Sequence, residues 1–298
     1  MKEISIIIPV HNNEKSLIPL YGDIKKNLKV FKNYNLIFID DCSIDNSLKN
    51  IKKIKLKDKN IKIIQNNYRI GQVGSIVKGV MLSDAKYYFL MSADLQDDPS
   101  LIKDFYFKIK KNKNDAQIFL FCKRNLHGTF SRKIFSYIYW KMIKFLTLGK
   151  SPKYGSDVIG FSKIIKQDII KQINKDDFLS IELIKSNYKK EIIYFDKKER
   201  IYGKSSYDYM KLFKLGFLSL SSFDLFSLIM LGFVSILLIL IFIIFAIYVL
   251  TDFLLSAEKI YIGWRSIILL NLFCFGLIFL HFGHINSILR KINSKLEK

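Results

Sequence analysis

The sequence predicts a doubly wound, Rossmann-like α/β domain followed by a two-helix transmembrane hairpin. Three observations in the 298-residue chain lead to this fold class. Short apolar runs alternate with stretches of helical periodicity through the first hundred residues, which is typical of a parallel sheet covered by helices. Acidic residues follow two of these runs, at Asp40-Asp41 and at Asp94. The last quarter contains 26 residues without a charge, from Leu225 to Leu250.

The expected strands and helices alternate along the chain. A parallel strand is buried on both faces, so we expect it as a continuous apolar run. Strands are expected at Ile4–Val10, Leu36–Ile39, Ile61–Ile64 and Tyr87–Met91, and helices at Lys15–Phe31, Asp45–Leu56 and Gly71–Ser83. Because ligands of such sheets bind at the carboxyl ends of the strands, the acidic residues mark the expected site.

Two apolar segments are long enough to cross a bilayer. Residues 225–250 exceed a hydrocarbon core of about 30 Å at a rise of about 1.5 Å per residue. Residues 262–285 carry one charge, Arg265, near their start. A buried core helix is the alternative for each, which the lengths disfavour. The basic residues that flank the pair are Lys204, Lys211, Lys214, Arg290, Lys291 and Lys295. The positive-inside rule therefore predicts a multi-pass protein of the cytoplasmic membrane, with both termini and the α/β domain on the cytoplasmic side.

The charge balance favours a membrane surface over nucleic acid. Lys and Arg number 48 against 26 Asp and Glu, a formal net charge of +22, yet only six of the basic residues are arginines. A lysine coat explains much of this charge. No helix-turn-helix, RNP or zinc-finger pattern supports nucleic-acid binding. The three cysteines, Cys42, Cys122 and Cys274, are scattered, which argues against a disulfide framework or a zinc site.

Two further segments combine basic and aromatic residues, which suits the lipid headgroup layer. They are Ser131–Lys150 and Tyr207–Phe223. The alternative is an amphipathic helix packed on the sheet. For the first segment the two interpretations are equally good. For the second segment, directly before the first expected span, an interfacial helix is favoured. The expected organisation is an α/β domain over 1–205, an interfacial helix over 206–223 and a transmembrane hairpin over 224–298.

The segment Asp94-Leu95-Gln96-Asp97-Asp98-Pro99 has the donor atoms for a divalent cation. A carboxylate at a strand end, with an amide oxygen two residues on, offers the oxygen ligands that Mg²⁺ and Mn²⁺ prefer. Such a cation neutralises the charge that develops on a diphosphate leaving group. An Asx-turn leading into a helix, with Pro99 near its start, explains the same residues structurally.

Three motifs in a fixed order carry a family resemblance. They are Ile6-Ile7-Ile8-Pro9-Val10-His11-Asn12, Ile39-Asp40-Asp41-Cys42-Ser43-Ile44-Asp45 and Ser92-Ala93-Asp94-Leu95-Gln96-Asp97. The set resembles the family 2 inverting glycosyltransferases of GT-A fold, with their I-P-V-Y-N-E, V-D-D-G-S-x-D and D-A-D-L-Q-D-P-P motifs. Further similarities are Gly71-Gln72 with Gly79, Gly155-Ser156-Asp157, and Arg200–Tyr207. The last segment resembles R-x-x-G-x-S-K-Y. Followed by two spans, it points to the polyprenyl-phosphate glycosyltransferases, the branch of dolichol-phosphate mannose synthase.

The resemblance implies a nucleotide-sugar donor site, for a UDP- or GDP-linked sugar. Asp41 and Ser43 would lie beside the base and ribose, and Pro9 and Asn12 would shape that pocket. Asp94, with Gln96, would bind Mg²⁺ or Mn²⁺ against the diphosphate of the donor.

The resemblance also implies the catalytic and acceptor-binding groups. The residues expected to carry catalysis are Asp94, Asp157, Arg124 and Arg200. The residues expected to bind the acceptor phosphate are Arg132, Arg200, Lys204 and Ser205. A polyprenyl phosphate is already largely dianionic at pH 7, because its second pKa is about 6, so it needs orientation more than deprotonation.

Several positions depart from the family pattern. Ser92 stands where many members have the first aspartate of D-x-D, and Cys42 replaces the usual glycine. The expected function is inverting sugar transfer to polyprenyl phosphate on the cytoplasmic leaflet, by a homo-oligomer that contacts membrane lipid. Transfer to another lipid-linked saccharide, and a membrane-anchored binding protein that has lost catalysis, remain alternatives.

Overall fold

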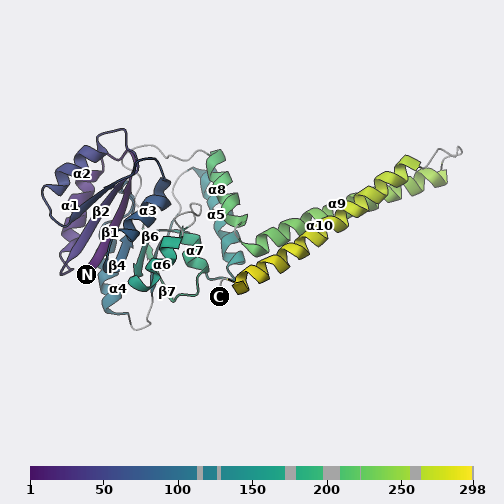
Figure 1. Cartoon of the computed structure of the whole chain (residues 1–298). Helices are drawn as coiled ribbons and strands as arrows, with labels where there is room; N and C mark the ends of the chain where they lie inside the picture. The colour runs from purple at the N-terminus through teal and green to yellow at the C-terminus, as the bar shows by residue number, and fades with distance from the viewer. Residues whose placement is uncertain are drawn as a thin grey trace. The chain divides into compact units, whose positions relative to one another are not determined.

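The computed structural model describes most of the chain. The described residues are 1–112, 117–125, 129–171, 179–196, 209–221, 223–255 and 263–296. The chain divides into two compact units, Met1–Leu215 and Gly216–Lys298 (Figure 1). The domain boundary expected after residue 205 falls in a segment outside the described residues.

The first unit is built on a seven-stranded mixed sheet. Its strands are β1 (Lys2–Val10), β2 (Tyr34–Asp40), β3 (Ile61–Gln65), β4 (Ala85–Leu90), β5 (Ile118–Lys123), β6 (Ser156–Ser162) and β7 (Lys190–Phe195). The order across the sheet is β3-β2-β1-β4-β6-β5-β7. Strands β1 to β4 pair in parallel, whereas β6 runs antiparallel to both of its neighbours, β4 and β5. The four strands and three helices expected from the first hundred residues are confirmed.

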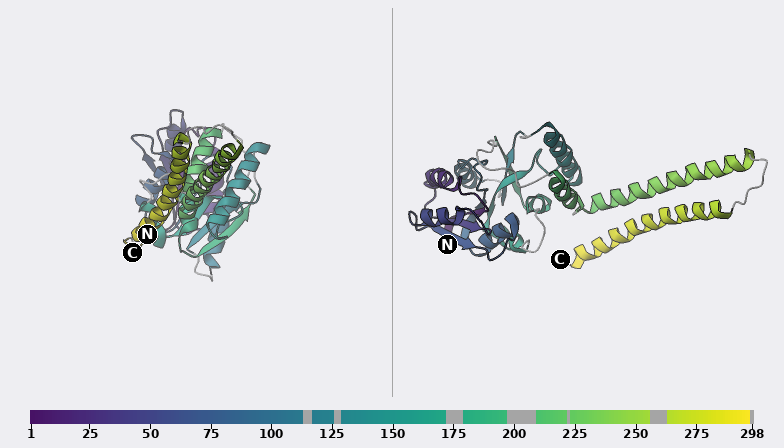
Figure 2. Two further views of the ribbon diagram at one scale, coloured as in Figure 1. Left: turned by 90° about the vertical axis from the view of Figure 1, so that its right-hand side faces the viewer. Right: turned by 90° about the horizontal axis from the view of Figure 1, so that it is seen from above.

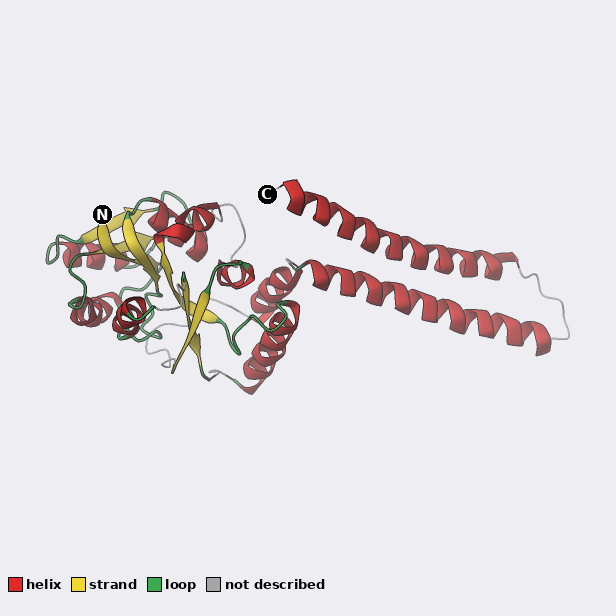
Figure 3. Cartoon of the chain, turned by 90° about the horizontal axis from the view of Figure 1, so that it is seen from below, coloured by secondary structure: helices red, strands yellow, loops and turns green. Residues whose placement is uncertain are grey.

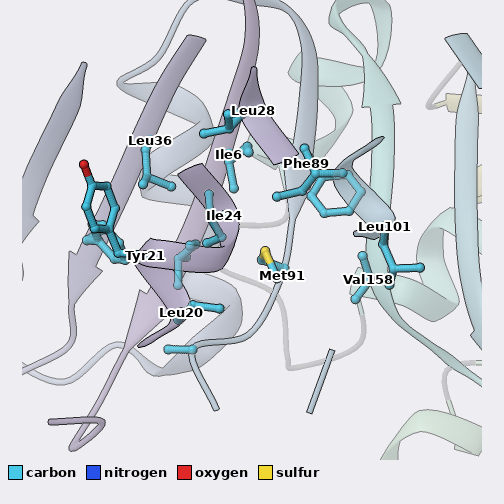
Figure 4. Packing of buried hydrophobic residues seen from close by; sticks show 14 of the residues in the cluster. Ile6, Leu20, Tyr21, Ile24, Leu28, Leu36, Phe89, Met91, Leu101 and Val158 are labelled. Carbon is cyan, nitrogen blue, oxygen red and sulfur yellow. The ribbon is translucent and has the colours of Figure 1, made fainter. Parts of the chain in front are cut away.

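Helices cover both faces of this sheet, as Figure 3 shows by colour. They are α1 (Leu17–Leu28), α2 (Ser47–Lys55), α3 (Gly71–Met81), α4 (Leu101–Lys110), α5 (Phe130–Leu146), η1 (Lys163–Ile165), α6 (Lys166–Ile170) and α7 (Leu179–Lys185). Residues of α1, α2 and α4 share one apolar cluster with alternate strand residues, and residues of α3, α6 and α7 share the other. The alternation of strand side chains thus gives the sheet two cores. Figure 4 shows part of the first, where Leu20 and Ile24 lie near Ile6, Leu36 and Met91.

One glycine sets how closely a helix approaches the sheet. A Cβ added to Gly79 of α3 would lie 2.8 Å from Ile7 Cγ2 and 2.9 Å from Ile39 Cδ1. No larger residue fits there unless α3 moves outward. The glycine therefore allows the C-terminal half of α3 to pack directly on β1 and β2.

The remaining helices are α8 (Tyr209–Ser221), α9 (Asp224–Leu255) and α10 (Gly263–Leu296). Helices α9 and α10 pack against each other, and Figure 2 shows them side by side. Gly276 of α10 faces Ile239, and the rings of Phe242 and Phe273 lie 5.4 Å apart.

Within the described residues, one helix is long and apolar enough to cross a membrane, over Leu228–Asp252. It contains most of the first expected span. The apolar part of α10, Ile267–Gly283, is shorter. The second expected span, and with it the transmembrane hairpin, stays a prediction.

Candidate active site

The carboxyl ends of β1, β2 and β4 bring the predicted motifs to one edge of the sheet. These strands are neighbours in the order β2-β1-β4. Each is followed by a residue with left-handed backbone: Asn12 at φ 55°, Cys42 at φ 58° and Leu95 at φ 61°. A left-handed residue turns the chain sharply, so each loop leaves its strand at once and exposes the strand end.

Pro9 lies where the sheet opens. The pairing of β1 with β4 ends at Ile7 and Leu90, and Ile7 accepts a hydrogen bond from the Met91 N–H on that side. Backbone groups of alternate residues in a strand point to the same side, so the nitrogen of Pro9, like that of Ile7, is on the β4 side. Proline has no N–H, and β1 makes no ladder hydrogen bond to β4 at this position. Beyond Pro9 the two strand ends therefore separate. In doubly wound sheets, ligands bind where the strand order reverses, and β1 and β4 flank such a point.

Asp41 anchors helix α3 to the end of β2. Its Oδ1 accepts hydrogen bonds from Asn66 Nδ2 and the Ile70 N–H, both at 2.9 Å. Its Oδ2 accepts one from the Gly71 N–H at 2.9 Å. The residue is 3% exposed. A carboxylate at a helix N-terminus satisfies N–H groups that lack partners in the helix and is stabilised by the helix dipole.

Asn12 and Ser43 clamp the first two loops together. The Asn12 N–H donates to Ser43 Oγ at 3.1 Å, and Asn12 Oδ1 accepts from the Ile44 N–H at 2.9 Å. His11 adds a contact of 2.8 Å between Nδ1 and the Asp41 carbonyl. A carbonyl only accepts, so Nδ1 carries the proton. The clamp fixes the positions of the residues expected to bind the base.

Asp45 also joins the loops after β1 and β2. Its carboxylate accepts hydrogen bonds from the N–H groups of Glu14, at 3.0 Å, and Ser47, at 2.9 Å. Burial opposes its ionisation, but the hydrogen bonds from Ser47 and Glu14 outweigh burial and hold the pKa of Asp45 below its usual value.

The loop after β4 presents Asp94, which is half-buried. Its Oδ1 lies 2.8 Å from Ser92 Oγ and 3.2 Å from the N–H of Gln96. The second contact closes an Asx-turn, so the turn expected as the structural explanation of this segment is present. Ser92 Oγ also lies 2.6 Å from Asp97 Oδ2, and Asp97 is 1% exposed.

These residues offer a partial ligand set for a divalent cation. Asp94 supplies a carboxylate, and the half-buried Gln96 carries an amide oxygen. Both are oxygen donors of the kind that Mg²⁺ and Mn²⁺ prefer, and Mg²⁺ commonly takes one or two carboxylates together with substrate phosphates. No group of three or more His, Cys, Asp or Glu suited to a metal occurs in the described part of the chain. The set fits a cation shared with a diphosphate.

A basic and aromatic pocket lies between α5 and the loop before β6. It is open, has a volume of about 530 Å³, and is lined by Arg124, Asn125, Lys133, Ile134, Tyr137, Lys153 and Tyr154. Arg124 pairs with Asp196 at 2.9 Å, and both side chains are more than half exposed. An exposed pair contributes at most about 1 kcal/mol, so an anionic ligand can compete for Arg124.

Trp140 fixes α5 against the strand that carries Asp157. A Cβ added to Gly155 would lie 2.0 Å from Trp140 Cζ2, so the indole packs directly on the glycine backbone. Helix α5 otherwise exposes apolar side chains together with Lys133, Lys141 and Lys144. Its large exposed residues include Phe130, Ile134, Phe135, Tyr137, Ile138 and Phe145.

The comparisons with known proteins agree with this architecture. The family model described as "Glycosyl transferase family 2" matches residues 5–173, which include the loops after β1, β2 and β4. The chain belongs to glycosyl transferase family 2. It is a glycosyltransferase of GT-A type.

Curated relatives extend the match beyond the family domain. An uncharacterised glycosyltransferase, YkcC of Bacillus subtilis, is 24% identical over 97% of this chain and 88% of its own length. The undecaprenyl-phosphate 4-deoxy-4-formamido-L-arabinose transferase of Proteus mirabilis is 26% identical over 72% of this chain and 66% of its own length.

Solved structures show the same fold at low identity. Mannosyl-3-phosphoglycerate synthase from Rubrobacter xylanophilus superposes with a TM-score of 0.51 at 10% identity, covering 72% of this chain and 71% of its own. Glucosyl-3-phosphoglycerate synthase from Mycobacterium tuberculosis, crystallised with Mn²⁺ and UDP-glucose, gives 0.50 at 13% identity, covering 73% and 76%.

The structure of this glycosyltransferase groups the predicted residues in two places. Pro9, Asn12, Asp41, Ser43, Asp94 and Gln96 lie at the strand ends, whereas Arg124 lines the pocket beside α5. Arg132 is half-buried on α5 and does not line the pocket. Asp157 lies in β6, but its side chain is outside what the structure describes. Arg200, Lys204 and Ser205 also lie outside the described residues.

Sequence reasoning missed three kinds of residue in this glycosyltransferase. Asn66 holds Asp41 from 25 residues away, which no local pattern shows. Lys133 and Lys153 line the basic pocket, but lysines are too common in this chain to stand out. The sequence shows Ser92 only as a departure from the family motif, whereas the structure shows that its hydroxyl contacts Asp94 and Asp97.

Proposed function

We propose that this glycosyltransferase transfers a sugar from a nucleotide-sugar donor to polyprenyl phosphate at the cytoplasmic face of a membrane, with inversion at the anomeric carbon. The observation that carries the acceptor assignment is the basic and aromatic pocket beside α5. Arg124, Lys133 and Lys153 give it positive charge, and Tyr137 and Tyr154 give it apolar surface. This combination suits a phosphate that carries a hydrocarbon chain.

The strand ends support the donor half of the proposal. Clamped loops after β1 and β2 leave Ser43 beside the point where the sheet opens, and Asp94 follows β4 on the other side of that point. A nucleoside would lie at the first pair of loops and its diphosphate near Asp94 and Gln96. The M. tuberculosis neighbour was crystallised with Mn²⁺ and a uridine nucleotide sugar, which favours a divalent cation and a nucleotide sugar here as well.

The membrane assignment has separate support. The stretch Leu228–Asp252 has the length and composition of a membrane span. Exposed aromatic side chains and lysines share α5, a mixture that suits the headgroup layer. Several curated relatives carry the name undecaprenyl-phosphate 4-deoxy-4-formamido-L-arabinose transferase, which favours a polyprenyl phosphate as a substrate here. The organisation into residues 1–205, 206–223 and 224–298, the second span and a homo-oligomer belong to the same proposal.

The reaction is a single in-line displacement. An oxygen of the acceptor phosphate forms the new bond to the anomeric carbon while the bond to the nucleoside diphosphate breaks. Asp94 and Gln96 would hold the divalent cation, which would supply positive charge to the departing diphosphate. Arg124, Lys133 and Lys153 hold the attacking phosphate beside the donor, which offsets the repulsion between two anionic groups. By the resemblance, Asp157 and Arg200 would orient the acceptor, and Arg132, Lys204 and Ser205 would bind its phosphate.

The test is sugar transfer by the full chain in detergent. We would measure label from a panel of nucleotide sugars in the lipid phase, with undecaprenyl phosphate as acceptor and Mg²⁺ or Mn²⁺ against a chelator. The proposal predicts metal-dependent label from one donor. Asp94→Ala should abolish transfer, whereas Asp104→Ala, at an exposed carboxylate in the first turn of α4, should not.

A second pair of variants tests the acceptor pocket. Lys133→Ala should raise the KM for polyprenyl phosphate about tenfold and leave the donor KM unchanged, because one charge-assisted phosphate contact is lost. The matched control is Lys144→Ala, at an exposed lysine of the same helix that does not line the pocket. Equal effects of the two variants would contradict the acceptor assignment.

Two other functions remain distinguishable. Label that enters only a preformed lipid-linked saccharide would indicate the other acceptor class. Donor binding without transfer to any acceptor would indicate a binding protein. The one sequence feature that favours this function is the serine at position 92.

A further inference from the structure

Ser92 makes two short contacts that its place in the motif does not explain. Its Oγ lies 2.8 Å from Asp94 Oδ1 and 2.6 Å from Asp97 Oδ2. A hydroxyl carries one proton, so Ser92 shares it between the two carboxylate oxygens in a three-centre hydrogen bond. One small side chain therefore links the carboxylate expected at the cation to a carboxylate in the interior.

The two carboxylates differ in their surroundings. Asp97 is 1% exposed and fixed in position by burial, whereas Asp94 is half-buried at the open end of β4. The link therefore runs from a fully buried carboxylate to a partly exposed one. The Gln96 N–H also contacts Asp94 Oδ1, at 3.2 Å. Two contacts on the same oxygen fix the plane of the Asp94 carboxylate.

We infer that Ser92 is a positioning residue of the cation site, which holds the Asp94 carboxylate in its binding orientation by bridging it to the buried Asp97. The inference rests on the proposed function, because it concerns the cation that the donor diphosphate shares. A metal site is only as strong as the groups that orient its ligands. In a site with few carboxylates, that orientation matters more.

A positioning role for Ser92 differs from that of a residue that only fills the place of a missing carboxylate. If Ser92 served only to fill space, its hydroxyl would be dispensable and alanine would bind the cation as well as serine does. If the bridge positions Asp94, loss of the hydroxyl lowers cation affinity, and a residue that keeps the hydroxyl retains it.

The experiment measures Mn²⁺ binding to the full chain in detergent by electron paramagnetic resonance, with UDP present and no acceptor. Ser92→Ala should weaken Mn²⁺ binding about tenfold, because a hydrogen bond to a charged group is lost. Ser92→Thr should stay within about threefold of the parent, and Ser92→Cys, with its weak donor, should lie between. Thermal unfolding of each variant shows that it is folded.

The matched control is Ser100→Ala, since Ser100 is exposed in the same segment and its side chain makes no capping hydrogen bond. Parent-like binding by Ser92→Ala, or equal losses in the alanine and threonine variants, would overturn the positioning role and leave the proposed function standing. Absence of Mn²⁺ and UDP binding by the parent chain would instead overturn the proposed donor site itself.

Discussion

Replacing Asp41 with asparagine tests whether this residue anchors α3 or binds the donor. Its carboxylate accepts three hydrogen bonds, from Asn66 Nδ2 and from the N–H groups of Ile70 and Gly71, all at 2.9 Å. Asparagine has one acceptor oxygen, and its amide N–H₂ group would face at least one of these donors. At 3% exposure, water does not replace the lost acceptor.

The expected cost is about 3 kcal/mol in the free energy of unfolding. A hydrogen bond to a charged group contributes about 1.5–3 kcal/mol, and here one bond is lost outright and two lose their charge. The favourable interaction of the carboxylate with the N-terminus of α3 is lost as well, at about 0.3–1 kcal/mol.

Urea unfolding of the full chain in detergent measures this cost. Trp140 packs on Gly155 in the first unit, so its fluorescence reports unfolding there. Trp264→Phe removes the second of the two tryptophans. Asp23→Asn is the matched control, since Asp23 forms an exposed pair with Lys26 at 2.8 Å and should cost less than about 1 kcal/mol. A stability loss below about 0.5 kcal/mol together with a tenfold loss of UDP affinity would refute the anchoring role.

Three further variants test other contacts of the first unit. Cys42→Gly should raise the unfolding midpoint, because glycine adopts the φ of 58° without the steric cost of about 1–2 kcal/mol; an unchanged or lower midpoint would contradict this. Gly155→Ala should destabilise by about 2–3 kcal/mol through its clash with Trp140, and a loss below about 0.5 kcal/mol would contradict that packing. Burial, followed by the hydrogen bond to Asp58, raises the pKa of Tyr34 to about 12. Burial of Asp58 is outweighed by hydrogen bonds, chiefly from Tyr34, so the pKa of Asp58 falls below 3.8. Tyr34→Phe should therefore lower the free energy of unfolding by about 1–2 kcal/mol at pH 7. The difference between the variant and the parent should be present above pH 3.8 and should disappear as the pH falls through the lowered pKa of Asp58. Urea unfolding at pH 7 and well below pH 3.8 measures it, and an equal difference at the two pH values would contradict the role of Asp58.

The first four strands could be predicted because parallel strands buried on both faces must be apolar throughout. Strand β6 could not, since Ser156, Asp157 and Gly160 interrupt its apolar pattern. Gly160 is nevertheless required, because a Cβ there would lie 2.4 Å from the ring of Phe105 on α4. That constraint comes from packing between segments 55 residues apart and leaves no local signature.

In the candidate site, too, some residues could be predicted from local sequence and others depend on contacts between distant segments. The motifs located Asp94 and Ser43 because each follows directly on a buried strand. The partners of Asp41 lie 25 to 30 residues away, and the basic pocket combines α5 with the loop before β6. Sequence spacing thus located the strand ends, whereas the hydrogen bonds that orient each carboxylate depend on the tertiary fold.

The three left-handed residues at the strand ends differ in what compensates their strain. Asn12 gains hydrogen bonds to Ser43 and Ile44, and the turn at Leu95 is closed by the bond from the Gln96 N–H to Asp94. Cys42 has only a contact of 3.4 Å from Sγ to the Asn66 carbonyl among its side-chain hydrogen bonds in the described structure. Sulfur is a weak donor, so this contact offsets little of the backbone cost. The β2 loop is therefore held mainly by its neighbours, through the clamp to Asn12 on one side and the Asp41 anchor on the other. It follows that changes in either neighbour should disturb the position of Ser43 more than changes at position 42 itself.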